Sequence, residues 1–90
     1  MERSITEKEK EMVINFGAFE YSAEYCAGVL AWPLKEVEQA MKKPESDFML
    51  AYNAGRLRSE YVIDLKLFEQ AQAGDIKSLE KLEMRKRKRK

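Results

Sequence analysis

Apolar residues recur along this chain every three or four positions, the spacing that places side chains on one face of an α-helix. Ser4 and Thr6 are each followed three residues later by a glutamate, and these overlapping capping boxes predict a first helix over about residues 6–17. We expect Gly17 and the residues after it to unwind this helix. No segment alternates apolar and polar residues as a strand does, so the sequence predicts an all-α fold of about five helices.

Two short helices joined by a tight corner are predicted between residues 22 and 43. Ser22 is suited to cap the first of them, because its hydroxyl can accept a hydrogen bond from a free backbone N–H. Pro33 keeps Trp32 out of the helical conformation and suits the first position of the next helix, where its missing N–H costs nothing. Pro44 ends that second helix. The face expected to be buried on the first of these helices carries Cys26, Val29 and Leu30.

A long fourth helix is predicted over about residues 47–73, and a short fifth helix follows it. Gly74 is suited to close the fourth helix and Asp75 to cap the fifth, which we expect to fray into the basic residues after residue 84. The segment 61–68 carries more apolar side chains than one helical face needs. This excess is either an interface between copies of the chain or a surface that the first and fifth helices cover. The interface candidates are Tyr61, Ile63, Leu65, Leu67 and Phe68.

The segment 22–43 fits a helix-turn-helix template. Ala27 is small enough for the second helix to cross close to it, and Ala31 occupies the turn position at which glycine is commonest. After the turn, Trp32 is expected to plug the core and Val37 to anchor the second helix. In DNA-binding proteins of this type the second helix enters the major groove, and its outward residues meet bases and phosphates.

The outward positions of this second helix supply the candidate DNA contacts. Gln39 can pair with adenine, and Lys35 can pair with guanine or a phosphate. Glu36 and Glu38 oppose this interpretation because carboxylates repel phosphates, although a glutamate can accept a hydrogen bond from cytosine. The alternative is a solvated surface helix. The candidates are Lys35, Glu38, Gln39, Lys42 and Lys43.

The charges divide the chain into two unlike parts. Its 90 residues carry 17 Lys and Arg against 16 Asp and Glu, a formal net charge of +1. The last six residues are all basic, so residues 1–84 hold 11 positive and 16 negative charges, a net of −5. We expect residues 1–84 to form a single helical domain and the tail to supply up to about six phosphate contacts, although a solubilising end is the alternative. The tail residues are Arg85, Lys86, Arg87, Lys88, Arg89 and Lys90.

Residue types that catalysis and metal binding commonly use are scarce. The chain has no histidine and a single cysteine, Cys26, and its four glycines are isolated instead of forming a phosphate-binding loop. We therefore predict no enzyme activity, no catalytic residue, no metal and no cofactor. The single cysteine, the lack of a signal-peptide pattern and the lack of a bilayer-spanning apolar run predict a cytoplasmic protein that does not contact the membrane.

Short motifs follow the predicted helix-turn-helix in a fixed order. They are Lys43-Pro44-Glu45-Ser46-Asp47-Phe48, Ala51-Tyr52-Asn53-Ala54-Gly55-Arg56-Leu57, Leu67-Phe68-Glu69-Gln70-Ala71 and Ala73-Gly74-Asp75. Over roughly residues 20–84 this order resembles the small terminase subunits of tailed phages and related prophage proteins. The resemblance implies a non-catalytic protein that binds viral double-stranded DNA near a packaging start and assembles into a ring-like homo-oligomer. It also implies a large ATPase and nuclease subunit as a partner, in the cytoplasm of a bacterial host cell.

Two other interpretations are open at this point. The first is a small transcriptional regulator that uses the same helix-turn-helix as a dimer. The second is a helical protein-interaction module without DNA binding, in which the outward lysines and the basic tail only keep the surface solvated.

Overall fold

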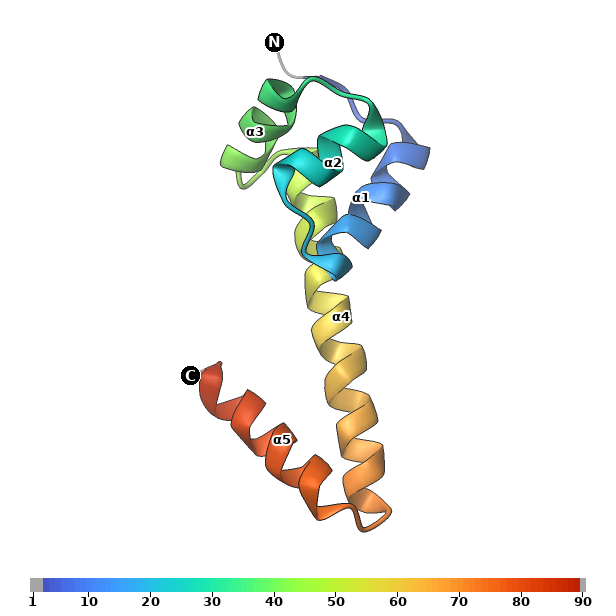
Figure 1. Ribbon diagram of the computed structural model, residues 1–90, viewed down its shortest axis with the longest axis vertical. Helices are drawn as coiled ribbons and strands as arrows, with labels where there is room; N and C mark the ends of the chain where they lie inside the picture. The colour runs from blue at the N-terminus through green and yellow to red at the C-terminus, as the bar shows by residue number, and fades with distance from the viewer. Residues whose placement is uncertain (1–2, 90) are drawn as a thin grey trace. The chain divides into compact units, whose positions relative to one another are not determined.

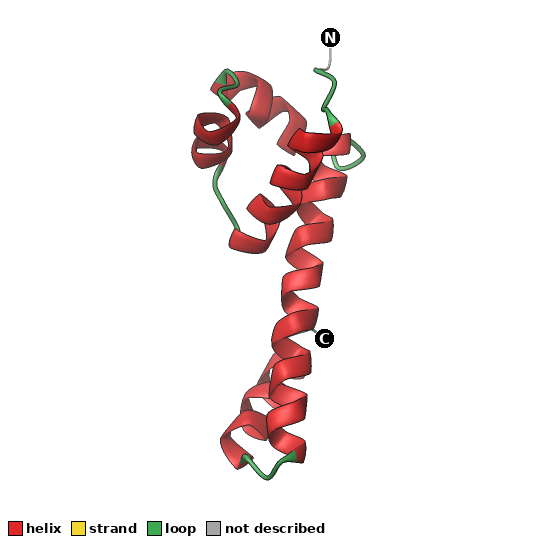
Figure 2. Ribbon diagram, turned by 90° about the vertical axis from the view of Figure 1, so that its right-hand side faces the viewer, coloured by secondary structure: helices red, strands yellow, loops and turns green. Residues whose placement is uncertain are grey.

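A computed structural model describes residues 3–89 of the chain (Figure 1). These residues form five α-helices joined by loops and contain no strand, which confirms the predicted all-α fold (Figure 2). The helices are α1 (Glu7–Phe19), α2 (Ala23–Leu30), α3 (Leu34–Lys42), α4 (Asp47–Gln72) and α5 (Ile76–Lys88). The chain divides within α4 into two compact units, one up to Arg58 and one from Ser59.

Helix α1 begins at the predicted capping box and ends later than expected. The Thr6 hydroxyl accepts a hydrogen bond from the Glu9 backbone N–H at 3.1 Å, and the Glu9 carboxylate accepts one from the Thr6 N–H at 3.0 Å. The expectation that Gly17 unwinds the helix is wrong. Helix α1 continues to Phe19 and ends at Glu20, whose φ of 56° is left-handed.

Gly17 lies inside α1 at the place where this helix crosses α4, and its missing side chain allows the two backbones to come into contact. A Cβ atom on Gly17 would lie 1.8 Å from the carbonyl oxygen of Tyr52 in α4. A Cβ atom on Gly55 would lie 1.7 Å from the carbonyl oxygen of Ile14 in α1. Each glycine thus meets the backbone of the other helix, and the two together fix the place where α1 crosses α4.

The unit up to Arg58 is built around one apolar core to which α1, α2, α3 and the start of α4 all contribute (Figure 1). The buried core residues are Val13, Phe16, Cys26, Ala27, Trp32, Val37, Phe48 and Ala51. On α2, Cys26 is buried as expected and Leu30 is half-buried, but Val29 is 53% exposed. The buried face of α2 is therefore narrower than its apolar spacing predicts.

The unit from Ser59 is a hairpin made of the second part of α4 and α5. Gly74 has a φ of 101°, and the Asp75 N–H donates to the Gln70 carbonyl at 3.0 Å, so glycine closes α4 as predicted. The Ser78 hydroxyl hydrogen-bonds to the Gln70 side chain at 3.0 Å next to this turn. The expected fraying after residue 84 is wrong, because α5 continues to Lys88.

Candidate nucleic-acid interface

The turn between α2 and α3 has the geometry that the template predicts. Ala31 adopts φ 58° and ψ 39°, a left-handed conformation that costs a residue with a Cβ roughly 1–2 kcal/mol. The Ala27 carbonyl accepts hydrogen bonds from the backbone N–H groups of both Ala31 and Trp32, the second at 3.1 Å. Pro33 precedes α3 at its N-cap, one position earlier than expected. The helix-turn-helix corner is thus closed by backbone hydrogen bonds to one small residue of α2.

Trp32 holds the turn between α2 and α3 against α1. Its side chain is 6% exposed, and its indole N–H donates to the Glu9 carboxylate at 2.8 Å. The Arg3 guanidinium lies 4.5 Å from the centre of the indole ring, on its face. The hydrogen bond from the Thr6 backbone N–H has the largest effect on the Glu9 carboxyl, and the one from the indole N–H the next largest; both hold its pKa below its ordinary value. The side chain that plugs the turn therefore also sets the position of the helix-turn-helix against α1.

Helix α3 is anchored by one residue and presents polar residues to solvent. Val37 is fully buried. Lys35, Gln39 and Lys42 are exposed and follow each other by four and three positions, so they share one helical face with Glu38 beside them. Lys43, at the C-cap, is also exposed. The structure thus brings four of the five candidates on this helix together on one outward face and places the fifth at its end.

One of the two carboxylates that oppose DNA binding is neutralised. The Glu36 carboxylate accepts an ion pair from Arg3 at 2.7 Å and is partly covered. Glu38 is exposed, and the structure gives it no ion pair within residues 3–89. The acidic character of the outward face is therefore carried by Glu38, beside two exposed lysines.

A cleft of about 190 Å³ lies beside α3, and Gln39 lines it. The charged residues of its lining are Arg3, Glu36, Lys43, Glu45 and Asp47. Three of these five are acidic, so the cleft does not favour a phosphate. The outward face of α3, and not this cleft, is therefore the candidate phosphate-binding surface.

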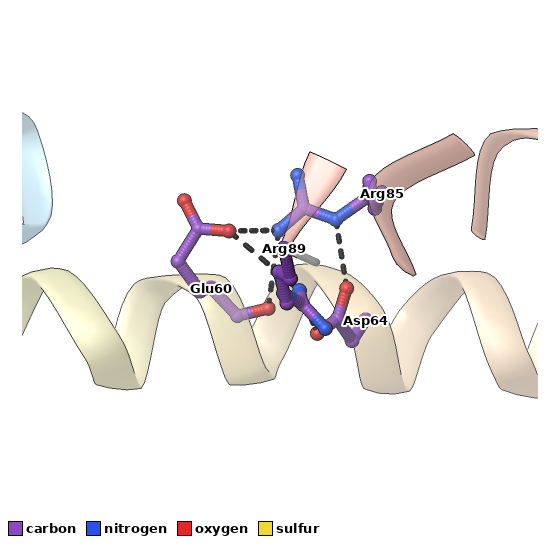
Figure 3. A network of polar contacts seen from close by, with 4 residues as sticks. All are labelled: Glu60, Asp64, Arg85 and Arg89. Carbon is purple, nitrogen blue, oxygen red and sulfur yellow. Dashed lines mark hydrogen bonds and ion pairs between the residues drawn. The ribbon is translucent and has the colours of Figure 1, made fainter. Parts of the chain in front are cut away.

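Two of the six tail cations hold the hairpin together (Figure 3). The Arg85 guanidinium donates from Nε to the Asp64 carboxylate at 2.7 Å and also pairs with the Glu60 carboxylate. Arg89 pairs with Asp64 and lies 3.8 Å from Glu60. The hydrogen bond from Arg85 lowers the pKa of Asp64, and the same bond raises the pKa of Arg85. This network explains why α5 stays helical into the basic run.

The sequence-based interpretation did not pair Glu60 and Asp64 with the arginines of the tail. The signal that could have found these pairs is a matched spacing, because the two acids lie four residues apart on α4 and Arg85 and Arg89 lie four residues apart on α5. Residues with the same spacing on two antiparallel helices can pair twice, as they do here.

The other tail residues differ from Arg85 and Arg89. Lys86 pairs with Glu83 on its own helix at 3.3 Å. Arg87 and Lys88 are exposed and make no ion pair within residues 3–89. Lys90, also a candidate, lies outside the described residues. The tail is therefore not a uniform row of cations open to phosphates.

The ion pairs of Arg85 and Arg89 and the hydrogen bond between Ser78 and Gln70 mark the sides on which α4 and α5 face each other. We call the residues on these sides the seam: Glu60, Asp64 and the half-buried Leu67 of α4, and Ser78, Leu82, Arg85 and Arg89 of α5. Of these residues, Leu82 is 7% exposed. Each of these residues is followed by a neighbour that turns about 100° away from the seam. On α4 these neighbours include Tyr61, Leu65 and Phe68, which are 65%, 40% and 49% exposed.

The predicted interface set divides across this seam. Tyr61, Leu65 and Phe68 each follow a seam residue and share one side, together with the exposed Leu79 of α5, which follows Ser78. We call these four residues the apolar face. Ile63 precedes a seam residue and lies on the other side, and Leu67 belongs to the seam itself. Of the five candidates, three are therefore exposed on the same side of the hairpin.

Neither a metal-ligand group nor a helix able to span a membrane occurs in the part of the chain that the structure describes. No group of three or more His, Cys, Asp or Glu within residues 3–89 is arranged to hold a metal ion. Cys26 is fully buried, and burial raises the pKa of its thiol. None of the helices in this range is both long and apolar enough to cross a bilayer.

Comparison of the chain with protein-family models, with characterised proteins and with solved structures gives no match.

Proposed function

We propose that this is a non-catalytic DNA-binding protein in which α3 enters the major groove of a duplex. The observation that supports this most is the corner from Ala27 to Val37. A left-handed turn residue, a buried plug and a buried anchor leave the polar face of α3 outward. This is the arrangement by which helix-turn-helix proteins present side chains to base edges.

The outward residues of α3 have distinct expected roles. Lys35, near the start of α3, and Lys42, near its end, would contact phosphates or guanine, and Gln39 between them would pair with adenine. Glu38 would be tolerated where it meets a cytosine amino group and would disfavour other bases. The face has two lysines against one exposed glutamate, so a single copy would bind weakly.

Weak binding by one copy becomes useful if several copies bind together. The apolar face supports this, because four large side chains exposed on one side of a small hairpin are characteristic of an interface. We propose a second copy of the chain as its occupant. A homo-oligomer places several α3 helices on one duplex without any increase in the affinity of each.

Within DNA-binding proteins, we favour the small-terminase type over a transcriptional regulator, on the motif order from Lys43 to Asp75. In that role the protein would recognise viral DNA for packaging in the cytoplasm of a bacterial cell and pass it to a large ATPase and nuclease subunit. Analytical ultracentrifugation separates the two roles. A particle of eight or more copies supports a packaging ring, and a particle of two copies supports the regulator.

The DNA-binding proposal is tested by fluorescence anisotropy on a labelled duplex at low salt. The full chain should bind, and the triple variant Lys35→Ala, Gln39→Ala and Lys42→Ala should bind more weakly. Lys8→Ala with Lys10→Ala is the matched control, because both lysines are exposed on α1. If the full chain shows no binding, DNA recognition is excluded. The exposed apolar face would then favour the interaction module.

A further inference from the structure

The hairpin has a second exposed side, opposite in character to the apolar face. Lys66 immediately precedes the seam residue Leu67, and Lys81 immediately precedes the seam residue Leu82. In an antiparallel helix pair, residues that precede a seam residue on either helix turn to the same side. Lys66 and Lys81 therefore share one side of the hairpin, across the seam from the apolar face.

Two more lysines belong to this side. Lys77 precedes Ser78, and Lys88 precedes Arg89. Along α5, Lys77, Lys81 and Lys88 follow each other by four and seven positions, which keeps them within about 40° of one another around the helix. All three and Lys66 are exposed, and none forms an ion pair within residues 3–89. We call Lys66, Lys77, Lys81 and Lys88 the basic face.

Two acids flank this side. Glu69 lies three residues after Lys66 on α4, and Asp75 caps α5, where the hydrogen bond from the Ser78 side chain and, to a smaller extent, the charge of Lys81 lower its pKa. The other residues that precede seam residues are Ser59, Ile63 and Met84. The acidic residues within α5 lie elsewhere. Glu83 follows Leu82, on the side of the apolar face, and Glu80 points away from the seam. The basic face is therefore a row of four exposed lysines without ion pairs in residues 3–89, with Asp75 and Glu69 at its edge.

We propose that the basic face binds the phosphate backbone of duplex DNA, as a contact separate from α3. From Lys77 to Lys88 the face extends about 16 Å along α5. Duplex DNA of that length carries about ten phosphate charges, so each lysine has a phosphate within reach. Three of the four lysines lie outside the basic run that ends the chain.

This assignment changes the role of the tail. Arg85 and Arg89 are held by Glu60 and Asp64 and close the hairpin, whereas Lys88 faces outward with the other three lysines. The ion pairs keep α5 helical at its end, and a helical α5 keeps Lys88 in phase with Lys77 and Lys81. A lipid surface is a poorer fit, because the large apolar side chains that would enter a bilayer lie mostly on the opposite side.

The inference rests on the proposed DNA binding and is tested with the full chain. The test variant changes Lys66, Lys77, Lys81 and Lys88 to Gln, which removes four charges at little cost in helix propensity. The control variant removes three charges from exposed sites outside α3 and the basic run, namely Lys8, Lys10 and Arg58. A third variant changes the four lysines of the basic face to Arg and keeps the charge. Circular dichroism confirms that all are folded.

Duplex affinity is measured by anisotropy over a range of salt concentrations. The Gln variant should bind about tenfold or more weakly at low salt, and its salt slope should be smaller by about 0.9 for each lysine that contacts a phosphate. The control variant should lose much less, and the Arg variant should bind as the unmodified chain does.

Three results would overturn the inference while leaving the proposed function in place. The first is a salt slope of duplex binding that is unchanged in the Gln variant. The second is an equal loss of duplex affinity in the control variant. The third is a Gln variant that keeps its duplex affinity and instead loses binding to anionic vesicles. If the unmodified chain binds no duplex at low salt, the proposed function fails and the inference fails with it.

Discussion

The two units of this chain are stabilised by different interactions. In the unit up to Arg58, eight buried apolar residues form one core and two helices meet backbone to backbone. In the hairpin from Ser59, Leu82 is the one buried apolar residue among those described, and the far end of the seam is closed by Arg85 and Arg89 on two carboxylates. Packing therefore fixes the helix-turn-helix, whereas charge fixes the hairpin. The large apolar side chains of the hairpin remain exposed and available to a partner.

The largest expected effect is a loss of stability at the place where α1 crosses α4, because the two backbones leave no room for another atom. Gly17→Ala would place a methyl group 1.8 Å from the Tyr52 carbonyl oxygen, so α1 and α4 must separate. We expect a loss of about 3 kcal/mol or more in the free energy of unfolding, measured by urea denaturation. Gly28→Ala is the matched control, because nothing lies within 4 Å of its Cβ. It should stabilise the protein by about 0.5–1 kcal/mol. Equal effects from the two variants would contradict the close crossing.

A smaller and local effect is expected in the hairpin. Arg85→Ala removes the side chain that bridges Glu60 and Asp64, so α5 should open without disturbing the core. Hydrogen exchange followed by mass spectrometry should show faster exchange in residues 76–88 and unchanged exchange in α1 to α3. Arg87→Ala is the control, because Arg87 is exposed and makes no ion pair within residues 3–89. Equal exchange in both variants would show that the network does not close the hairpin.

The hairpin should also respond to acid. The pKa of Asp64 is lowered in the folded chain, so its ion pairs contribute stability above the unfolded value of about 3.9, and this contribution is lost as the pH falls through the folded value. We expect exchange in α5 to be constant from neutral pH to about pH 5, after correction for intrinsic rates, and to rise below about pH 4. In Asp64→Asn this acid-dependent rise should be reduced. A rise already present near pH 6 would assign the effect to another group.

The smallest expected effect is on the rate at which the buried thiol of Cys26 reacts. Cys26 is fully buried and its pKa is raised by burial, so it should react with a thiol reagent only when the core opens. The folded chain should react slowly near neutral pH, and the chain in urea should react at the rate of a free thiol. Fast labelling under native conditions would mean that the first unit opens locally.

The local signals of the sequence predicted the boundaries of the helices well where they rest on backbone hydrogen bonds. Thr6 and Gly74 act at the positions that their capping chemistry predicts. Trp32 and Val37 are buried as the helix-turn-helix template requires. These features depend on a few neighbouring residues, and so the sequence alone contains them.

The features that the sequence did not predict depend on residues far apart in the chain. Gly17 looks like a helix breaker until Tyr52 is found against it. Arg85 looks like part of a free tail until Asp64 is found beside it. For the same reason the apolar segment 61–68 could not be divided into an exposed face and a seam before the partner helix was placed.

The central claim is that α3 is the surface that meets DNA. It is tested most directly by titrating a duplex into the isotope-labelled full chain and following the backbone amide signals. We predict shifts along Leu34–Lys42 and around the basic face, with residues 8–11 of α1 unchanged. A chain that binds the duplex with no shift along α3 would contradict the account.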